Sequence, residues 1–337
     1  MKIIVEANIP YIKGLLEPVG KVEYLPAAAI TKEAVADADA LFVRTRTRCD
    51  AALLDGSLVQ FIATATIGTD HIDLQYCRQK GIAVSNAPGC NAPAVAQYVF
   101  AAIGSRFCAD TIGRLKLGVV GVGHVGSIVA RWGNRLGMDV MLCDPPRKRS
   151  EGGNFVELGE IAREADIITF HTPLNRSGED CTLHLADTAF FAKLQHCRLL
   201  INSSRGAVVD NLALLAALNS GKVDAAAIDC WESEPCINRE LLDKAFIATP
   251  HIAGYSQEGK MRATAMALQA FEQHFGLDIK GIPHVAAPLK GAEITDIAQV
   301  TASYDPLADT TRLKSDPDSF ESLRNNYHLR PEVIVGI

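Results

Sequence analysis

The chain has 337 residues, of which 48% are hydrophobic and 21% are charged, and its formal net charge is −6. This near-average composition argues against a disordered chain or a coiled coil, and the length predicts about two domains. The acidic balance argues against nucleic acid or an anionic membrane as a partner.

The nine cysteines lie between Cys49 and Cys236 and include no C-x-x-C pair. This pattern is typical neither of a disulfide scaffold nor of a zinc site, so we expect reduced thiols and no metal. Only Cys90, in a polar turn, is a candidate for lining a site. The opening residues MKIIVEANIP lack the apolar core of a secretory signal, and prolines and asparagines interrupt the uncharged stretch 81–105. We therefore expect a cytoplasmic protein.

The first part of the chain alternates short β-branched runs with helical patterns, which is typical of a parallel sheet with crossover helices. Strands are expected at 2–6, 40–44, 60–64 and 82–85. Helices are expected near 10–18, 31–37, 50–55 and 72–80, and an apolar helix from about 91 to 105.

A second alternating unit opens with LKLGVVGVGHVG at 115–126. Its further strands are expected at 138–143, 166–170, 198–202, 224–228 and 245–249, which completes a six-stranded, doubly wound nucleotide domain. A long helical pattern follows residue 256. Beyond Pro283 the composition becomes polar, which indicates either an oligomerisation extension or a loosely packed tail.

The predicted fold class is therefore α/β, with two doubly wound parallel-sheet lobes of the Rossmann type, a cleft between them and a small C-terminal extension. The first lobe is expected over 1–95, completed by the helix at about 256–280. The nucleotide-binding domain is expected over 96–255 and the extension over 284–337.

A glycine-rich turn indicates a dinucleotide site. It consists of Gly121, Val122, Gly123, His124, Val125 and Gly126, and it lies between an expected strand and an expected helix. Such a turn lets a pyrophosphate approach the backbone at a helix N-terminus. Asp144, at the end of the next strand, is placed to bind ribose hydroxyls and to repel a 2′-phosphate. The basic run 147–149 could instead pair with that phosphate, but it follows two prolines. NAD is the predicted cofactor.

Three more motifs follow expected strands at the edge where open sheets bind ligands. Arg205 presents a fork of donors suited to a carboxylate. His251 is a natural base for oxidising an alcohol, and Glu234, in DCWESEP, can orient its ring. The ordinary alternatives are that Arg205 is a surface arginine and that His251 is a structural histidine.

GVGHVG, HTPL (171–174), NSSRGAVVD (202–210), DCWESEP (229–235) and PHIAGYS (250–256) together resemble the D-isomer-specific 2-hydroxyacid dehydrogenase family. The resemblance covers about residues 1–290. It implies that Arg205 holds the substrate carboxylate, Glu234 orients the histidine and His251 exchanges the proton. It also implies that NAD is contacted by Asp144, Thr172, Asp229 and Gly254. The substrate contacts that it implies are Thr45, Thr66 and Tyr255.

PGCN, LCDPPR, FHTPL with LHLAD, and HIAGYS more narrowly resemble family members that oxidise 4-phospho-D-erythronate on the route to pyridoxal phosphate, and these imply a homodimer. A phosphorylated substrate requires cations. Arg44 and Arg46 would share one face if their strand continued, although a solvated strand edge explains them equally well. Another 2-hydroxy acid, such as 3-phosphoglycerate, is the alternative substrate. A non-catalytic NAD-sensing scaffold is the alternative function.

Overall fold

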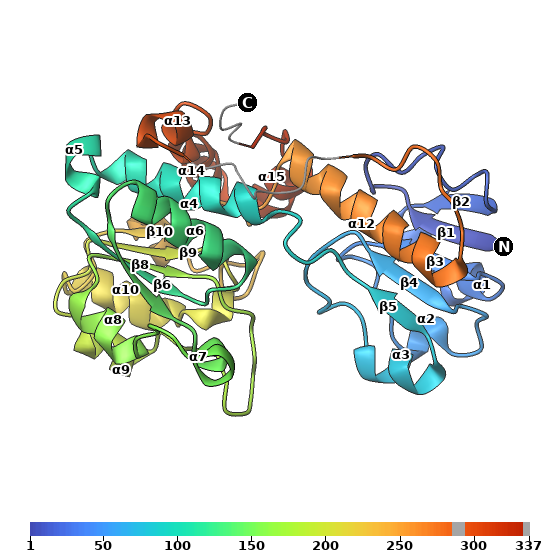
Figure 1. Ribbon diagram of the computed structural model, residues 1–337, viewed down its shortest axis with the longest axis horizontal. Coiled ribbons are helices and arrows are strands. Elements are labelled where there is room, and N and C mark those ends of the chain that lie inside the picture. Colours follow the sequence, from blue (N-terminus) through green and yellow to red (C-terminus); the bar gives the residue numbers. More distant parts are fainter. Residues whose placement is uncertain (285–293, 333–337) are drawn as a thin grey trace. The chain divides into compact units, whose positions relative to one another are not determined.

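The computed structural model describes residues 1–284 and 294–332, which form two compact units (Figure 1). Within these described residues, the first unit comprises 1–91 and 257–284. The second comprises 92–256 and 294–332. The chain therefore leaves the first unit, builds the second, and returns to the first with one long helix.

The first unit is built on a five-stranded parallel sheet in the order β2-β1-β3-β4-β5. The strands are β1 (Lys2–Glu6), β2 (Lys21–Leu25), β3 (Ala40–Val43), β4 (Phe61–Thr64) and β5 (Ala83–Ser85). The short helices of this unit are η1 (Ala27–Ala29), α1 (Lys32–Val35), α2 (Ala51–Leu54) and α3 (Leu74–Lys80), and the long helix is α12 (Gln257–Phe275).

Helices cover both faces of this sheet. Because successive side chains of a strand point to opposite faces, Phe42 and Phe61 turn toward α12, where both rings contact Phe271 edge-on. Leu41 and Ile62 turn the other way, into a second apolar cluster. The central strands are therefore buried on both faces, which explains their continuous apolar sequences.

One expectation for this unit was wrong, and one strand was missed. Residues 10–18 form turns rather than a helix, because Pro10 and Pro18 bound the segment and Gly14 has a φ of +86°. The strand β2 was not predicted. It lies at the sheet edge, where its side chains are half-buried or exposed, so its sequence KVEYL lacks the apolar run of a central strand.

The second unit holds a six-stranded parallel sheet in the order β11-β10-β9-β8-β6-β7. The strands are β6 (Lys116–Val120), β7 (Asp139–Cys143), β8 (Ile167–Phe170), β9 (Leu199–Asn202), β10 (Ala226–Ile228) and β11 (Ile247–Ala248). All six lie where the sequence predicts them. The strand order reverses at β6, whose neighbours are β7 and β8, so the carboxyl ends of these strands form the switch point where open sheets bind ligands.

Helices also cover both faces of the second sheet (Figure 1). One face packs against α4 (Ala92–Arg106) and α6 (His124–Arg135). The other packs against α8 (Leu158–Glu164), α9 (Thr188–Lys193), α10 (Asn211–Asn219) and α11 (Arg239–Lys244). Two short helices, α5 (Ala109–Ile112) and α7 (Pro145–Glu151), and the turn η2 (Gly206–Val208) complete this part. No helix among the described residues is long and apolar enough to cross a membrane.

The C-terminal region packs onto the second unit through α13 (Ile297–Thr301), α14 (Pro306–Ser315), η3 (Pro317–Ser319) and α15 (Phe320–Asn325). Val300 joins the core beside α4, and Leu313 and Phe320 are fully buried in the opposite cluster. Gly104 permits the approach of α13, since a Cβ there would lie 2.4 Å from Thr301 Cγ2. A loosely packed tail is therefore the wrong interpretation for residues 294–332.

Candidate active site

The glycine-rich turn joins β6 to α6. Gly121 has a φ of +86°, and a Cβ on Gly126 would lie only 2.0 Å from the Gly121 carbonyl oxygen, so the fold itself requires both glycines. Around Gly123, by contrast, an added Cβ would meet nothing within 4 Å. The space beside Gly123 is the space that a pyrophosphate needs in order to reach the N-terminus of α6 at His124 and Val125.

Asp144 follows β7 and braces this turn. Its carboxylate accepts hydrogen bonds from the backbone N–H groups of Val122 (2.8 Å) and Arg147 (3.1 Å). The Arg147 guanidinium donates to the Val122 carbonyl (2.7 Å) and pairs with Glu151 (2.6 Å). The next two cations of the run also pair with carboxylates, those of Glu157 and Asp180. Because these cations have protein partners, the site favours ribose hydroxyls over a 2′-phosphate.

Two buried hydroxyls lie just beyond neighbouring strands. The Oγ1 of Thr172, after β8, and the Oγ of Ser203, after β9, have no hydrogen-bond partner among the residues that the structure describes. A buried, unpaired hydroxyl is costly unless a ligand completes it. The turn, Asp144 and these hydroxyls therefore fit a dinucleotide across the carboxyl edge of the sheet. Sequence reasoning named Thr172 but missed Ser203, although Ser203 shares a loop with Arg205.

Asp229 follows β10 and ties its loop to the loop after β11. The buried carboxylate accepts hydrogen bonds from Thr249 Oγ1 (2.7 Å) and from the N–H groups of Ile252 (2.8 Å) and Ala253 (3.0 Å). The Asp229 carbonyl also accepts from the N–H of His251 (2.9 Å). Burial raises the pKa of Asp229, although His251 and these hydrogen bonds oppose the shift. Asp229 thus fixes the backbone that carries His251 and, two residues beyond Ile252, Gly254.

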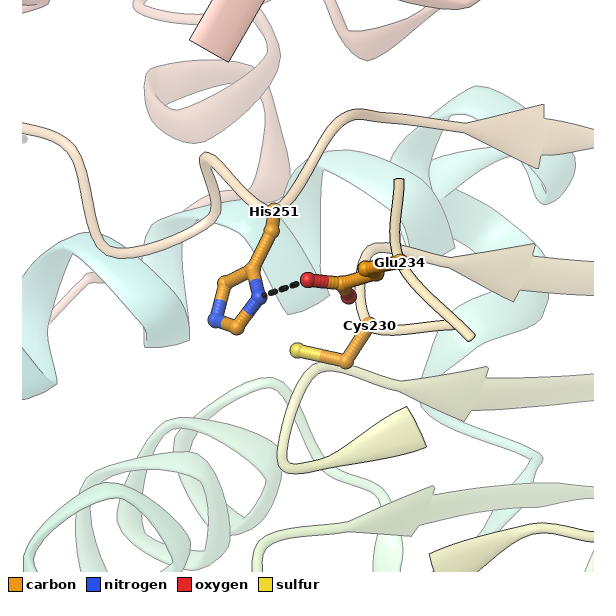
Figure 2. Close-up of side chains that lie close together, drawn as sticks. All are labelled: Cys230, Glu234 and His251. Carbon is orange, nitrogen blue, oxygen red and sulfur yellow. Dashed lines mark hydrogen bonds and ion pairs between the residues drawn. The ribbon is translucent and has the colours of Figure 1, made fainter. Parts of the chain in front are cut away.

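The His251 ring is paired with Glu234 (Figure 2). Nδ1–H of His251 donates to Glu234 Oε2 over 2.9 Å, and the other carboxylate oxygen accepts from the Trp231 N–H over 2.8 Å. His251 has a φ of 58°, an uncommon value for a residue with a side chain. Its side chain is 28% exposed. Because Nδ1 is occupied, Nε2 is the nitrogen left to exchange a proton.

The charges of this pair reinforce one another. Burial disfavours the imidazolium, but Cys230 and Glu234 favour it, and the balance raises the pKa of His251 well above its ordinary value. At Glu234 burial is outweighed by the hydrogen bond from His251, so the pKa of the carboxyl is lowered. Burial raises the pKa of the Cys230 thiol. The lowered pKa keeps Glu234 ionised, so its carboxylate is one source of the charge that stabilises the imidazolium.

The polar atoms of Cys230, Glu234 and His251 lie within 4.8 Å of one another, a spacing that a metal ion could also use (Figure 2). Each already has a protein partner, since the thiol donates to the Ser204 carbonyl over 3.4 Å. The Arg324 guanidinium, 3.9 Å from Glu234 Oε2, already places a positive charge beside this cluster. These contacts favour an acid–base pair.

The other glutamate of DCWESEP has a different partner. Glu232 accepts hydrogen bonds from His184 Nε2 (2.7 Å) and from the Asn211 N–H (2.8 Å). This second histidine–glutamate pair joins the motif to the loop before α9 and to the start of α10. The geometry therefore separates the two glutamates, and only Glu234 reaches His251.

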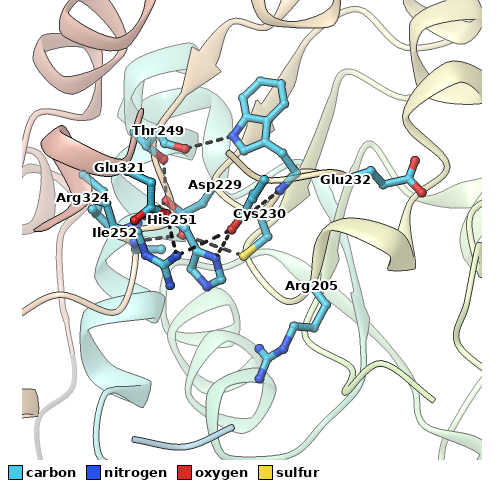
Figure 3. Close-up of polar contacts among 12 residues, drawn as sticks. Arg205, Asp229, Cys230, Glu232, Thr249, His251, Ile252, Glu321 and Arg324 are labelled. Carbon is cyan, nitrogen blue, oxygen red and sulfur yellow. Dashed lines mark hydrogen bonds and ion pairs between the residues drawn. The ribbon is translucent and has the colours of Figure 1, made fainter. Parts of the chain in front are cut away.

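Arg205 lies in the loop after β9, near the Cys230 loop (Figure 3). Its Nη1 donates to the Ser204 carbonyl over 2.8 Å. Gly206 allows this loop to approach the loop after β10, since a Cβ on Gly206 would lie 1.9 Å from the Trp231 carbonyl oxygen. The structure thus brings Arg205, Glu234 and His251 to the carboxyl ends of three adjacent strands, β9, β10 and β11.

Tyr255 lies beyond His251 in the same loop, and its ring contacts Tyr327 with centroids 6.2 Å apart. Arg324, on α15, interacts with the Tyr255 side chain and lies near both Glu234 and Glu321 (Figure 3). Sequence reasoning missed Arg324, because a polar C-terminal segment gives no motif that would join it to a site more than 70 residues earlier.

The remaining predicted substrate residues lie in the first unit. The strand β3 ends at Val43, so Arg44 and Arg46 occupy a turn, and the shared-face argument for them was wrong. The buried Glu6 carboxylate holds this turn by accepting from the Arg44 N–H and the Thr47 hydroxyl, both over 2.8 Å. Thr45 and Arg46 are exposed there.

Thr66 follows β4. Its hydroxyl forms a hydrogen bond with the Thr64 hydroxyl (2.6 Å) and donates to the Gly68 carbonyl (3.1 Å).

Cys90 is the cysteine that the sequence analysis named as a candidate for lining a site. It is buried, and its backbone carbonyl accepts a hydrogen bond from Arg262 over 2.7 Å.

Known proteins resemble this chain over its whole length. Residues 97–253 match the D-isomer specific 2-hydroxyacid dehydrogenase, NAD binding domain. The chain is 48% identical to the erythronate-4-phosphate dehydrogenase of Bacteroides thetaiotaomicron over 100% of both proteins. It is 41% identical to that of Porphyromonas gingivalis, over 97% of this chain and 92% of the relative.

The chain belongs to the D-isomer specific 2-hydroxyacid dehydrogenase family. It is an oxidoreductase whose cofactor is NAD. Among solved structures, a D-lactate dehydrogenase of Aquifex aeolicus complexed with NAD and lactic acid is 25% identical, with a TM-score of 0.68 over 82% of this chain and 96% of that one. A glyoxylate reductase from Paecilomyes thermophila, 21% identical, shares the fold with a TM-score of 0.69 over 86% of this chain and 98% of that one.

Proposed function

We propose that the protein oxidises the 2-hydroxyl of 4-phospho-D-erythronate to a 2-oxo group, giving (R)-3-hydroxy-2-oxo-4-phosphooxybutanoate in the synthesis of pyridoxal 5′-phosphate. The observation that carries the proposal is the hydrogen bond from His251 Nδ1 to Glu234 at the edge of the NAD-binding sheet. Relatives named for this activity, similar over the full chain, support the choice of substrate.

In the proposed reaction, Nε2 of His251 removes the proton of the 2-hydroxyl, and Glu234 stabilises the imidazolium that forms. The Arg205 guanidinium binds the substrate carboxylate with two parallel hydrogen bonds. NAD, when bound, accepts the hydride that leaves C2. The turn at Gly121, Gly123 and Gly126 and the carboxylate of Asp144 hold the dinucleotide, with Thr172, Asp229 and Gly254 along the same edge.

For the substrate, we propose contacts from Thr45 and Thr66 and from Tyr255. Arg44 and Arg46 are the cations proposed for its phosphate. In the first unit, Arg44 Nη1 donates to the Asn8 carbonyl over 3.1 Å, which uses one donor of its guanidinium. We further propose that the protein is cytoplasmic and that it forms a homodimer. Sedimentation velocity of the purified chain would test the homodimer.

The experiment measures NADH formation by the purified protein with three acids in parallel: 4-phospho-D-erythronate, D-3-phosphoglycerate and D-erythronate. A 2-oxo acid is added as acceptor in a second series, in case the protein retains NADH. Turnover confined to the first acid supports the proposal. Equal turnover of D-3-phosphoglycerate would contradict the substrate assignment, and turnover of D-erythronate would contradict a phosphate site.

A further inference from the structure

The C-terminal segment 320–330 holds the backbone that carries the proposed base. Arg330, in this segment, is only 6% exposed. Its guanidinium donates to the carbonyls of Ile252 (3.1 Å), Ala253 (2.5 Å) and Tyr255 (3.2 Å), all in the loop that begins at His251. It also bonds to the Ala94 carbonyl and the Gln97 side chain on α4, and it stacks on the Tyr304 ring at 4.1 Å.

These contacts cannot be supplied by another side chain. A guanidinium presents five N–H donors in a rigid plane, whereas an ammonium group is compact and cannot span the same carbonyls. Without Arg330, the carbonyl oxygens of Ala253 and Tyr255 would each lose a donor, and that of Ile252 would keep the N–H of Tyr255. The segment therefore sets the path of the loop after His251.

The same segment brings a second cation to the pair itself. Arg324 Nη1 lies 3.9 Å from Glu234 Oε2, the oxygen that accepts the proton of His251 Nδ1, and 3.8 Å from Glu321 Oε1. Both distances exceed a hydrogen bond, so Arg324 acts on these carboxylates through its charge. Its side chain is 21% exposed, which leaves the interaction only partly screened by water.

We propose that segment 320–330 belongs to the active site. Arg324 is a positioning residue that sets the proton affinity of the His251–Glu234 pair, and Arg330 fixes the loop after His251. A cation beside the pair opposes the imidazolium and keeps Glu234 ionised. The pKa of His251 is therefore lower than it would be if Glu234 stood beside the ring without a cation. The kinetic consequences rest on the proposed function, whereas the proton affinity of His251 does not.

Arg324→Met tests the charge with little change of volume. We expect the pKa of His251 to rise by about one unit, because the imidazolium loses a cation several ångströms away. The titration is followed by NMR of protein labelled with ¹³C-histidine, with the His251 signal assigned from its absence in His251→Asn. In the oxidation direction the acidic limb of kcat/KM should move to higher pH by the same amount.

Two variants serve as controls. Arg324→Lys keeps the charge and should leave the His251 titration near its original position. Arg312→Met removes a cation from α14 that is 67% exposed and paired with Asp309, and it should change neither the titration nor kcat. An unchanged His251 titration in Arg324→Met would overturn the role of Arg324. A shifted titration in a protein with no turnover of 4-phospho-D-erythronate would instead contradict the proposed function.

Arg330→Lys tests the loop. We expect kcat to fall at least tenfold, with KM changed less, at a temperature where circular dichroism shows the variant to be folded. If the variant loses thermal stability but keeps the wild-type kcat per folded molecule, Arg330 is structural only and its part of the proposal is wrong.

Discussion

At the scale of single residues, the site depends on which nitrogen of His251 is occupied. In the proposed mechanism, the hydrogen bond from Nδ1 to Glu234 leaves Nε2 for the substrate, and Cys230 and Glu234 together raise the pKa of the ring against the effect of burial. Asp229 accepts hydrogen bonds from the backbone N–H groups of residues 251–253, which fixes the backbone that carries the ring. These contacts make separate predictions for the histidine and for the glutamate.

His251→Asn removes the proposed base while keeping a side chain of similar polarity. We expect kcat to fall by about 10²–10⁴-fold, the usual contribution of a general base. NADH binding, measured by fluorescence titration, should remain within about twofold because the glycine turn is untouched. His196→Asn changes an exposed histidine that is paired with Asp224 and should retain full activity. Substantial turnover by His251→Asn would remove His251 from the mechanism.

Glu234→Gln keeps a hydrogen-bond acceptor but removes the charge. Cys230 and Glu234 both raise the pKa of His251, so removing the charge of Glu234 should lower that pKa and move the acidic limb of kcat/KM for oxidation to lower pH. We expect kcat to drop by about tenfold to a hundredfold because the imidazolium is less stabilised. The matched control is Glu232→Gln, whose carboxylate is paired with His184. A profile that shifts equally in both variants would contradict the assignment of Glu234.

At the scale of elements, the turn between β6 and α6 separates two uses of glycine. Gly126 is required by packing, since its Cβ would collide with the Gly121 carbonyl, whereas Gly123 faces open space. The sequence motif alone treats these glycines alike. The structure distinguishes them because the distance between the strand and helix backbones depends on how the whole unit packs.

Gly123→Ala and Gly126→Ala should therefore affect different properties, namely NADH affinity in the first variant and stability in the second. Gly126→Ala should lower the free energy of unfolding by about 2 kcal/mol or more, because the turn must open to relieve the contact. Gly123→Ala should keep its unfolding temperature but bind NADH at least tenfold more weakly, because its methyl group occupies the path of the pyrophosphate. Thermal unfolding and fluorescence titration on the same samples separate the two. Normal NADH affinity in Gly123→Ala would contradict the proposed position of the dinucleotide.

Strands with buried, β-branched runs were predictable because burial on both faces of a parallel sheet requires such sequences, as in FIAT of β4 and LLIN of β9. The edge strand β2 and the turns at 10–18 were not, because an edge strand has weak patterning and because the positive φ of Gly14 ends a helix that its neighbours would permit.

At the scale of the whole molecule, the C-terminal region shows how few apolar residues suffice to attach a polar segment. Ile294, Val300, Leu313 and Phe320 are its fully buried anchors, and they enter the cores on the two sides of the second sheet. The overall polarity of this region reflects its solvent face. The average composition of the C-terminal region therefore does not reveal that it packs against the second unit.

Phe320→Ala should lower the free energy of unfolding by about 3–5 kcal/mol, since it leaves a cavity in a closed core. Leu307→Ala, at a position that is 39% exposed on α14, should cost less than about 1 kcal/mol. Denaturant unfolding of both variants measures the difference. Equal small losses would show that α15 is not anchored as described.

The sequence by itself determined the two parallel sheets, the dinucleotide turn and the identity of Arg205, Glu234 and His251 as candidates, because each depends on local patterns at strand ends. Only the tertiary structure decided which glutamate reaches His251 and showed that the buried Ser203 hydroxyl has no hydrogen-bond partner among the described residues. It also brought Arg324 and Arg330 to a loop more than 70 residues away. Those contacts join segments distant in the chain, and their geometry arises from packing, which no local pattern encodes.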